Sequence, residues 1–449
     1  MAVRGWAPLL WLPAVGALFS AFDISAVVWD EEEKSNEAWG YVEVRSNAYM
    51  FWWLYYTDNT TKNFTDLPLV MWLQGGPGAS SCGYGNFEEI GPYDTELNPR
   101  NTTWLQAVNL LFVDNPVGSG FSYTNDTNAF AKDLATVSAD MLVFLKAFFK
   151  NKTEFQNVSF YIFSESYGGK MAAAIALELS KAIQEETINC KFEGVALGDA
   201  WISPIDSVLT WGPYLYSTSL LDDKGLTEVT DAAKQILDAV SSGKYKEATT
   251  LWSQMEDIIT NNTDGVNFYN ILTKDSPETK ELKFDNLMLA ILYLHHVNPL
   301  QNINLDELMN GPIRAHLSII PDKVVWGGQA SDVFSNMEDD FMKPVIDTVD
   351  QLLMTGINVT VYNGQLDLIV DTVGQENWVK KLKWSQLDQF LKQKWKALHI
   401  SPTSIETAAF YKAHENFAFY WILKAGHMVP LDQGEMALKL LRMVTNQET

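Results

Sequence analysis

Short apolar runs alternate with longer amphipathic segments over the first half of the chain. Strands are predicted at residues 49–56, 69–73, 110–113, 158–163 and 195–197, and helices at 128–149 and 169–185. Strands and helices in alternation are typical of an α/β domain with a mostly parallel central sheet. We therefore expect a sheet domain to begin near residue 27 and to continue to residue 204.

The pattern changes at about residue 205. Residues 205–332 are charged and helical in pattern, with breaks rich in Asn, Asp, Gly and Thr and without a clear strand. The alternation then returns, with a helix predicted at 345–354, strands at 359–362 and 417–422, and a last helix from about Gln433. The sequence thus predicts a sheet domain in two parts, 27–204 and 333–449, interrupted by a mainly helical insertion of the size of a small domain.

The first 26 residues have the features of a secretory signal peptide. Arg4 precedes an apolar run at 6–19, and small residues follow at 20–26. The run is shorter than the ~20 residues that cross a bilayer, so we expect residues 1–26 to be removed by cleavage within 20–26. The later apolar run at 287–294 predicts a buried helix, so no membrane span is expected after cleavage.

Composition indicates a chain with a large core and a strong negative charge. Of its 449 residues, 47% are hydrophobic, which excludes a disordered chain. The 56 acidic against 32 basic side chains give a net charge of −24, which argues against nucleic acid or an anionic membrane surface as a partner. Such a chain suits an acidic lumen, where many carboxylates take up protons. Only Cys82 and Cys190 could form a disulfide, and the sequence leaves their pairing open.

Eight N-x-Ser/Thr sequons favour a secreted or lysosomal protein. One sequon often arises by chance, but eight in a chain with a signal peptide indicate lumenal glycosylation. Because Asn157 starts a predicted strand and Asn358 lies beside one, we expect these two to be partly buried. The sequons begin at Asn59, Asn63, Asn101, Asn125, Asn151, Asn157, Asn261 and Asn358.

The segment 164–169, Ser-Glu-Ser-Tyr-Gly-Gly, follows a predicted strand and opens a predicted helix. This is the pattern of a nucleophile elbow, because a sharp strand-to-helix turn leaves room only for small residues around its Ser. Ser166 would then lie at a helix N-terminus, where backbone N–H groups stabilise negative charge. A serine that only caps the helix fits this segment equally well.

The segment 72–78, Trp-Leu-Gln-Gly-Gly-Pro-Gly, favours the nucleophile over the cap. It follows an early strand, and a Gly-Gly turn in that place can present N–H groups as the second half of an oxyanion hole. A phosphate-binding loop is the alternative, but the Lys of such a loop is missing.

A histidine and a carboxylate complete the candidate chemistry. His427 follows the predicted strand 417–422, and Asp367 follows the strand 359–362, with Asp371 as a rival. The order Ser, Asp, His is that of a hydrolase sheet. In that arrangement His427 takes the proton from the serine, and Asp367 orients the imidazole and stabilises its charged form.

Neither a metal nor a cofactor is predicted. No HExxH motif and no Cys/His cluster occurs in the chain. His295 and His296 would point to different sides of a helix, which makes them a poor metal pair.

These segments together resemble the serine carboxypeptidase family. The resemblance runs through about 35–205 and 333–445, and it includes Phe-Glu-Glu-Ile-Gly-Pro at 87–92, the segment 114–123 and Gly-Asp-Ala-Trp at 198–201. It implies an α/β-hydrolase fold with a mixed, mostly parallel central sheet and a helical inserted lid. It also implies an exopeptidase that removes C-terminal residues from peptides.

The resemblance assigns a role to each candidate in the catalytic group. The nucleophile corresponds to Ser166, the acid to Asp367 and the base to His427. The oxyanion donors correspond to the backbone N–H groups of Gly76 and Tyr167. The resemblance requires no cofactor.

The resemblance further implies a group that binds the C-terminal carboxylate of a peptide: Trp72, Gln74, Glu89 and Glu165. Two glutamates in contact raise each other's pKa, so at acid pH they hold protons and donate hydrogen bonds. Exopeptidase activity should therefore weaken as the pH rises.

The chain departs from the family pattern at two positions. Gln74 replaces the usual Asn, and Ala79 replaces a common Cys, so that family disulfide cannot form there. These departures keep two alternatives open. One is a weakly active or non-catalytic binding or protective protein on the same fold, and the other is an acyltransferase or esterase.

Overall fold

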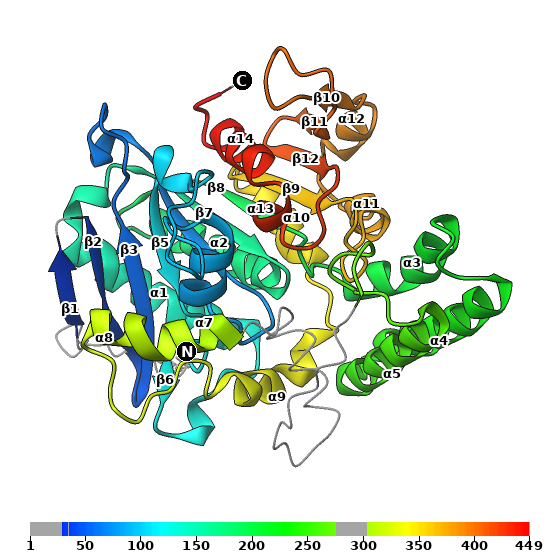
Figure 1. The fold of residues 1–449 in the computed structure, drawn as a ribbon, viewed down its shortest axis with the longest axis horizontal. Helices are drawn as coiled ribbons and strands as arrows, with labels where there is room; N and C mark the ends of the chain where they lie inside the picture. Colours follow the sequence, from blue (N-terminus) through cyan, green and yellow to red (C-terminus); the bar gives the residue numbers. More distant parts are fainter. Residues whose placement is uncertain (1–28, 35, 275–302, 449) are drawn as a thin grey trace, which may run out of the picture.

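A single large sheet forms the centre of the molecule in a computed structural model, which describes residues 29–34, 36–274 and 303–448 (Figure 1). The strands lie in the order β1-β2-β3-β5-β4-β7-β8-β9-β12-β11-β10, and β6 pairs with β3. The strands from β5 to β12 in this order are parallel, and the strands at both edges are antiparallel. The predicted signal peptide, the helix predicted at 287–294, and His295 and His296 lie outside the described residues.

The central strands lie where the apolar runs predicted them. Two have the predicted bounds, β4 (Leu69–Leu73) and β12 (Phe417–Ile422). The other predicted strands are β3 (Ala48–Tyr55), β5 (Asn109–Val113), β7 (Ser159–Glu165), β8 (Lys191–Gly198) and β9 (Asn358–Gly364). Parallel strands are buried on both faces, and this produces the continuous apolar runs. The mixed, mostly parallel α/β sheet is thus confirmed.

The edge strands were not predicted. They are β1 (Trp29–Lys34), β2 (Glu37–Arg45), β6 (Tyr123–Thr124), β10 (Lys396–Leu398) and β11 (Ala409–His414). In β2 a glycine and three charged residues interrupt the apolar pattern, yet most of the strand is buried. Its Glu37 carboxylate accepts a hydrogen bond from the indole of Trp53 at 3.0 Å and lies 2.8 Å from the imidazole of His316, which satisfies the buried acid.

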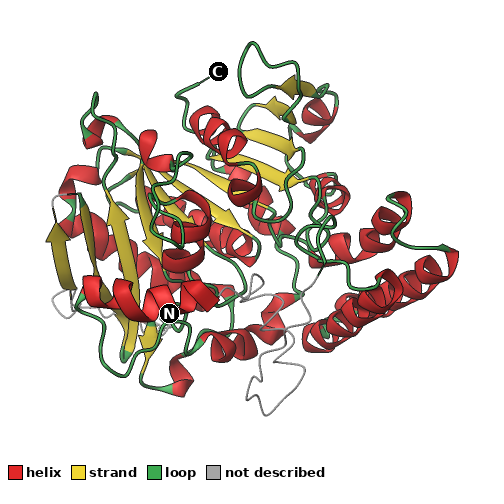
Figure 2. Ribbon diagram, viewed as in Figure 1, coloured by secondary structure: helices red, strands yellow, loops and turns green. Residues whose placement is uncertain are grey.

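Helices pack around the sheet (Figure 2). The helices of the sheet domain are α1 (Leu134–Asn151), α2 (Tyr167–Gln184), α10 (Ile346–Met354), α11 (Thr372–Val379), α12 (Leu387–Leu391), α13 (Val429–Asp432) and α14 (Gly434–Val444). The predicted start of α1 at residue 128 was wrong. The carboxylate of Asp133 accepts a hydrogen bond from the N–H of Thr136 and caps the helix, while Thr127–Ala129 forms a separate 3-10 turn. Further 3-10 turns lie at Phe64–Asp66, Trp104–Gln106 and Thr153–Phe155.

The described parts of 205–332 are largely helical and lie in two places. The helices α3 (Pro204–Ser217), α4 (Asp223–Ser241) and α5 (Tyr245–Thr263) extend away from the sheet (Figure 1). The short helices α7 (Ile303–Leu308), η7 (Met309–Ile313) and α8 (Arg314–Leu317) reach the edge strands, where Trp39 donates to the carbonyl of Leu317 at 2.8 Å. The last helix, α9 (Ala330–Phe341), continues into the second part of the sheet domain.

The surface carries the sequons. Seven of the eight sequon asparagines are exposed, and Asn59 is half-buried. The expectation that Asn157 and Asn358 are partly buried was wrong, because Asn157 precedes β7 and the side chain of Asn358 points outward at the first position of β9. Cys82 and Cys190 are both buried and unpaired. Among the described helices, none combines the length and apolar character that a membrane span requires.

Candidate active site

Ser166 occupies a strained turn between β7 and α2. Its backbone has φ 61° and ψ −130°, a conformation that residues other than glycine rarely adopt. Neighbouring segments hold it there, because its N–H donates to the carbonyl of Gly198 at 3.0 Å and its carbonyl accepts from the N–H of Trp201 at 2.9 Å. The hydroxyl makes no capping hydrogen bond to the helix. The turn therefore has the geometry of a nucleophile elbow and not that of a simple cap.

Glycines allow the turn at 72–78 to approach this elbow closely. A Cβ on Gly75 would lie 2.6 Å from Cβ of Ser166, and a Cβ on Gly168 would lie 2.3 Å from the carbonyl of Leu73. Ser164, at the small position of the elbow pattern, is fully buried and donates to the carbonyl of Ala196 at 3.0 Å. Close packing thus requires glycine at positions 75 and 168 and leaves Ser164, two residues before Ser166, without solvent contact.

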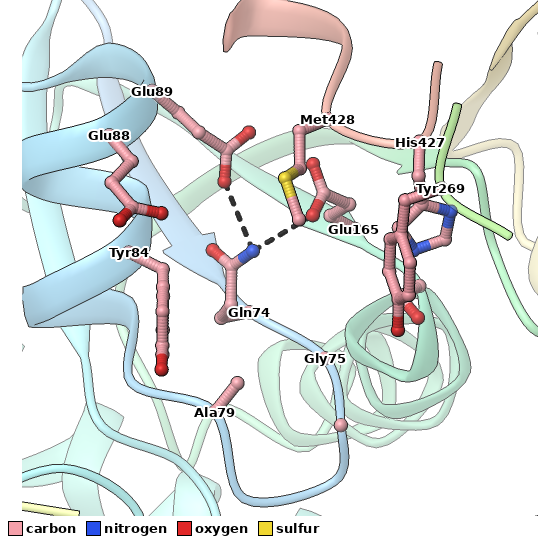
Figure 3. A pocket seen from close by; sticks show the side chains of 12 residues that line it. Gln74, Gly75, Ala79, Tyr84, Glu88, Glu89, Glu165, Tyr269, His427 and Met428 are labelled. Atoms are coloured by element: carbon pink, nitrogen blue, oxygen red, sulfur yellow. Dashed lines mark hydrogen bonds between the residues drawn. The ribbon is translucent and has the colours of Figure 1, made fainter. Parts of the chain in front are cut away.

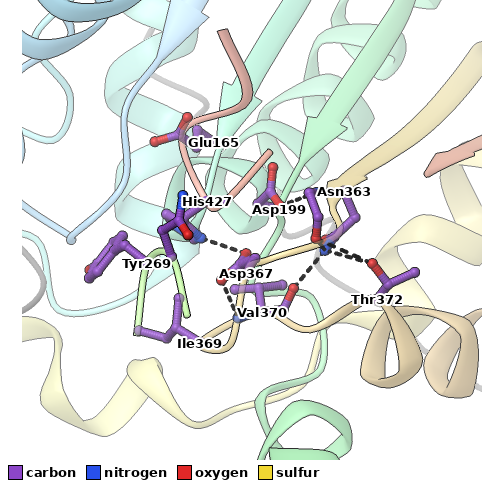
Figure 4. A network of polar contacts seen from close by, with 12 residues as sticks. Glu165, Asp199, Tyr269, Asn363, Asp367, Ile369, Val370, Thr372 and His427 are labelled. Carbon is purple, nitrogen blue, oxygen red and sulfur yellow. Dashed lines mark hydrogen bonds and ion pairs between the residues drawn. The ribbon is translucent and has the colours of Figure 1, made fainter. Parts of the chain in front are cut away.

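His427 and Asp367 form a buried pair. Nδ1 of the imidazole lies 2.8 Å from Oδ2 of the carboxylate, and both side chains are almost fully buried (Figure 4). The N–H of Val370 lies 3.2 Å from Oδ1 of Asp367, and the Asn363 amide donates to the carbonyl of Val370 at 2.8 Å, so the loop after β9 holds the carboxylate. Nε2 of His427 is buried and has no hydrogen-bond partner among the described residues.

Asp371, the rival carboxylate, has another place. It caps α11 by accepting from the N–H of Gly374 at 2.9 Å, and the hydroxyl of Thr210 donates to it at 2.7 Å. Burial raises its pKa to about 7. The structure therefore brings Asp367, and not Asp371, to the histidine.

A pocket brings the two parts of the sheet domain together. Gly75, Gly76 and Ser166 line it from the first part and His427 from the second. Tyr269, from the segment after α5, closes one side: its ring lies edge-on to the imidazole at 4.8 Å, and its carbonyl accepts from the N–H of His427 at 2.7 Å. Tyr167 is the first residue of α2, so its N–H has no acceptor within the helix.

The four residues expected to bind a carboxylate form one hydrogen-bonded group, of which Figure 3 shows Gln74, Glu89 and Glu165. The indole of Trp72 donates to Oε1 of Gln74 at 2.7 Å. Nε2 of Gln74 lies 3.0 Å from Oε1 of Glu89 and 2.8 Å from Oε1 of Glu165. One amide therefore joins both glutamates, whose carboxyl groups also contact each other. The second oxygen of each, Oε2, is buried and meets no hydrogen-bond donor within the described chain.

These glutamates have altered proton affinities. Both are about 2% exposed. Burial raises the pKa of Glu165 well above its ordinary value, and the adjacent charge of Glu89 raises it further. Burial also raises the pKa of Glu89. The pair therefore holds a proton in the acid range.

A π-helix, η3 (Ser81–Ile90), carries Glu89 and was not predicted. It presents Glu88 as well as Glu89 to the pocket. The Arg100 guanidinium satisfies its C-terminal end by donating to the carbonyls of Phe87 at 2.6 Å and Gly91 at 3.1 Å. A Cβ on Gly85 would lie 2.4 Å from the Trp72 ring, so this glycine lets the helix pack closely against Trp72. The two glycines at 83 and 85 broke the apolar pattern that would have indicated a helix.

Asp199, which follows β8, was not predicted as a site residue. One side-chain ligand atom from each of Asp199, Asp367 and His427 lies within 4.8 Å of the other two, the one cluster among the described residues that a cation could bridge. Because Nδ1 of His427 already contacts Asp367, we assign these atoms to the hydrogen-bond network.

Comparison with known proteins gives consistent matches over most of the chain. The model of the family described as serine carboxypeptidase matches residues 29–447. The chain is 66% identical to retinoid-inducible serine carboxypeptidase of Rattus norvegicus, over 98% of both proteins. It is 42% identical to serine carboxypeptidase-like 51 of Arabidopsis thaliana, over 91% of this chain and 92% of the relative. In fold it is similar to the crystal structure of Kex1(delta)p, a prohormone-processing carboxypeptidase from Saccharomyces cerevisiae, with a TM-score of 0.78, 23% identity and 91% of each chain covered.

Proposed function

The chain belongs to the serine carboxypeptidase family, and we propose that it removes single C-terminal residues from peptides at acid pH. One observation carries the proposal. The pocket that contains Ser166 and His427 is also lined by Gln74, Glu89 and Glu165, whose hydrogen bonds suit them to hold a terminal carboxylate.

The catalytic cycle follows from the Asp367–His427 contact. A proton on Nδ1, held by Asp367, leaves Nε2 as the acceptor. Ser166 attacks the carbonyl of the last peptide bond while Nε2 takes its proton. The backbone N–H groups of Gly76 and Tyr167 receive the developing oxyanion. The imidazolium then gives the proton to the leaving amino acid, and water hydrolyses the acyl-enzyme by the same steps.

The glutamate pair restricts cleavage to the chain end. Protonated Glu89 and Glu165 donate hydrogen bonds from Oε2 to the substrate carboxylate, which sets the last peptide bond over Ser166. Raised pKa values keep the protons on these acids at low pH. As the pH rises the pair ionises and repels the substrate, so the Michaelis constant increases.

The insertion 205–332 belongs to the same proposal. Tyr269 lies within it and contacts His427, so this segment shapes the wall of the pocket next to the base. We propose that it acts as a lid that influences which peptides enter. Trimming the α4–α5 hairpin should then alter peptide preference.

The N-terminus and the sequons support entry into the secretory pathway. Residues 1–26 act as the signal peptide in this proposal, and the destination is the secreted or lysosomal lumen. Exposure of seven sequon asparagines suits them for glycosylation. Treatment with an N-glycosidase should increase the electrophoretic mobility of the protein.

A labelling experiment tests the function directly. A fluorophosphonate should label the wild type and not Ser166→Ala, and the wild type should release one amino acid at a time from peptides with a free C-terminus. Amidated peptides should resist cleavage. Equal labelling of Ser166→Ala would contradict the proposal, and transfer of the acyl group to added amines or alcohols would favour an acyltransferase.

A further inference from the structure

Asp199 is held against the catalytic pair by its backbone. Its φ of 40° lies in the left-handed region that favours glycine. Its N–H donates to the carbonyl of Tyr362 at 2.8 Å, and Oδ1 accepts from the N–H of Gly364 at 2.8 Å. The carboxyl group is fully buried, within the cluster that also contains Asp367 and His427 (Figure 4).

The surroundings of Asp199 are acidic. Asp367, on the loop after β9, lies in the same cluster. The charges of Glu165 at the end of β7 and Glu89 on η3, and the phenol of Tyr362, also interact with Asp199. The imidazole of His427, after β12, is the single group of this cluster that can carry positive charge.

The Oδ2 atom of Asp199 is buried and meets no hydrogen-bond donor of the described residues. An ionised carboxylate would leave this oxygen unsatisfied beside the charge of Asp367, which is costly. A protonated Oδ2 removes that cost, because it becomes a donor and Asp367 is an acceptor. Burial, and then the charge of Asp367, raise the pKa of Asp199 well above its ordinary value.

We propose that Asp199 is a positioning residue that, as a neutral carboxylic acid, donates a hydrogen bond from Oδ2 to the Asp367 carboxylate. The assignment rests on the proposed function. Asp367 is then held from two sides, by Asp199 and by His427.

The consequence is an active site suited to acid. A hydrogen bond to Asp367 disperses its negative charge, so Asp367 stabilises the imidazolium less. We therefore expect replacement of Asp199 to change the pH at which Ser166 becomes reactive. Glu89 and Glu165 hold their protons at acid pH, because burial raises the pKa of both. In this proposal Asp199 thus lets His427 act as the base in the same pH range in which Glu89 and Glu165 bind the carboxylate.

The test measures the labelling rate against pH with an uncharged fluorophosphonate. Such a probe has no carboxylate, so ionisation of Glu89 and Glu165 does not control its binding. Asp199→Leu removes the donor and should move the lower inflection up by about one pH unit. Asp199→Asn keeps a donor that cannot ionise, and its inflection should stay within a few tenths of the wild type. If the lower inflection of Asp199→Asn instead fell by one pH unit or more, the substitution would have removed a negative charge, and this would overturn the proposal.

An infrared measurement covers the case in which Asp199→Leu does not fold. The difference spectrum of wild type minus Asp199→Asn at about pH 6 should contain the C=O band of a protonated carboxylic acid. Glu165→Gln provides the matched control. The difference spectrum of wild type minus Glu165→Gln should contain the band of Glu165, and this band should differ in position from that of Asp199. A missing Asp199 band would overturn the proposal whether or not the protein is active. Failure of the wild type to label would contradict only the proposed function.

Discussion

The indole nitrogen of Trp72 donates to Oε1 of Gln74 at 2.7 Å, and this contact decides which end of the Gln74 amide faces the two glutamates. With the oxygen held by Trp72, the NH₂ group must face Glu89 and Glu165, as observed. An amide in this orientation is a donor to both acids. The remaining oxygens of the acids are then available for a substrate carboxylate.

Replacing Gln74 tests this arrangement. Gln74→Met keeps the length of the side chain but removes both hydrogen bonds to the glutamates. We expect the Michaelis constant for peptides to rise about 10-fold or more, which corresponds to roughly 1.4 kcal/mol. The rate of fluorophosphonate labelling should fall much less, because the probe lacks a carboxylate. Steady-state kinetics on a blocked dipeptide measures the first quantity, and an equal loss in both would contradict a role in carboxylate binding.

Trp72→Phe is the matched control for the orientation of the amide. It leaves Gln74 in place but releases Oε1. The amide can then rotate and turn its oxygen toward an acid, so peptide binding should weaken by less than in Gln74→Met. A larger effect than that of Gln74→Met would indicate that Trp72 acts chiefly through packing.

Replacing Glu165 tests the pH dependence. Burial and the charge of Glu89 raise the pKa of Glu165, so the wild type loses its protonated pair as the pH increases. Glu165→Gln keeps a donor that cannot ionise. We expect the Michaelis constant of the wild type to rise at least several-fold from acid to alkaline pH, and that of Glu165→Gln to rise less. Glu88→Gln, in the same pocket, should keep the steep dependence of the wild type.

Gly75 tests the close approach at the elbow. A Cβ at this position would lie 2.6 Å from Cβ of Ser166, so Gly75→Ala must displace the serine. We expect the labelling rate to fall by about 100-fold, since a shift of about 1 Å at a reacting group has this effect. Gly311→Ala is the control, because a Cβ there meets no atom within 4 Å and the residue is exposed. Labelling of Gly75→Ala at the wild-type rate would contradict the packing argument.

The parts of the site that the sequence predicted are those set by local pattern. The elbow at Ser166 and the loops with Asp367 and His427 each follow a buried strand, and parallel strands end at one edge of the sheet. Their meeting could therefore be expected from chain order alone. The bridging amide of Gln74 could not, because its orientation depends on Trp72 and on a π-helix that no apolar periodicity indicated.

Asp199 could not be predicted from local pattern either. Its role depends on contacts with residues 165 and 168 positions further along the chain, Gly364 and Asp367. The edge strand β2 was missed for a similar reason, because its buried Glu37 is satisfied by partners on β3 and α8 that lie far from it in the sequence.

Replacing Asp367 and Asp371 in turn distinguishes a catalytic aspartate from a structural one. Asp367→Asn would lose the proper imidazole tautomer, so we expect kcat to fall by about 10⁴-fold. Asp371→Asn, four residues on, leaves the Asp367–His427 contact in place and should change kcat by less than about 10-fold. The concentration of folded enzyme, measured for each variant by active-site titration, is used to calculate both kcat values. A comparable loss of kcat in both variants would contradict the assignment of Asp367.

Asp371 makes stability depend on pH. Burial raises its pKa from the ordinary 3.8 to about 7, so folding favours its protonated form. Its contribution to the free energy of unfolding is complete below about pH 4 and is lost as the pH rises through 7. A difference of about 3 in pKa corresponds to at most roughly 4 kcal/mol. Asp371→Asn can still cap α11 and cannot ionise. The denaturant midpoint of the wild type should therefore fall more steeply between about pH 4.5 and 7 than that of Asp371→Asn, and equal slopes would show that the native carboxyl is ionised throughout this range.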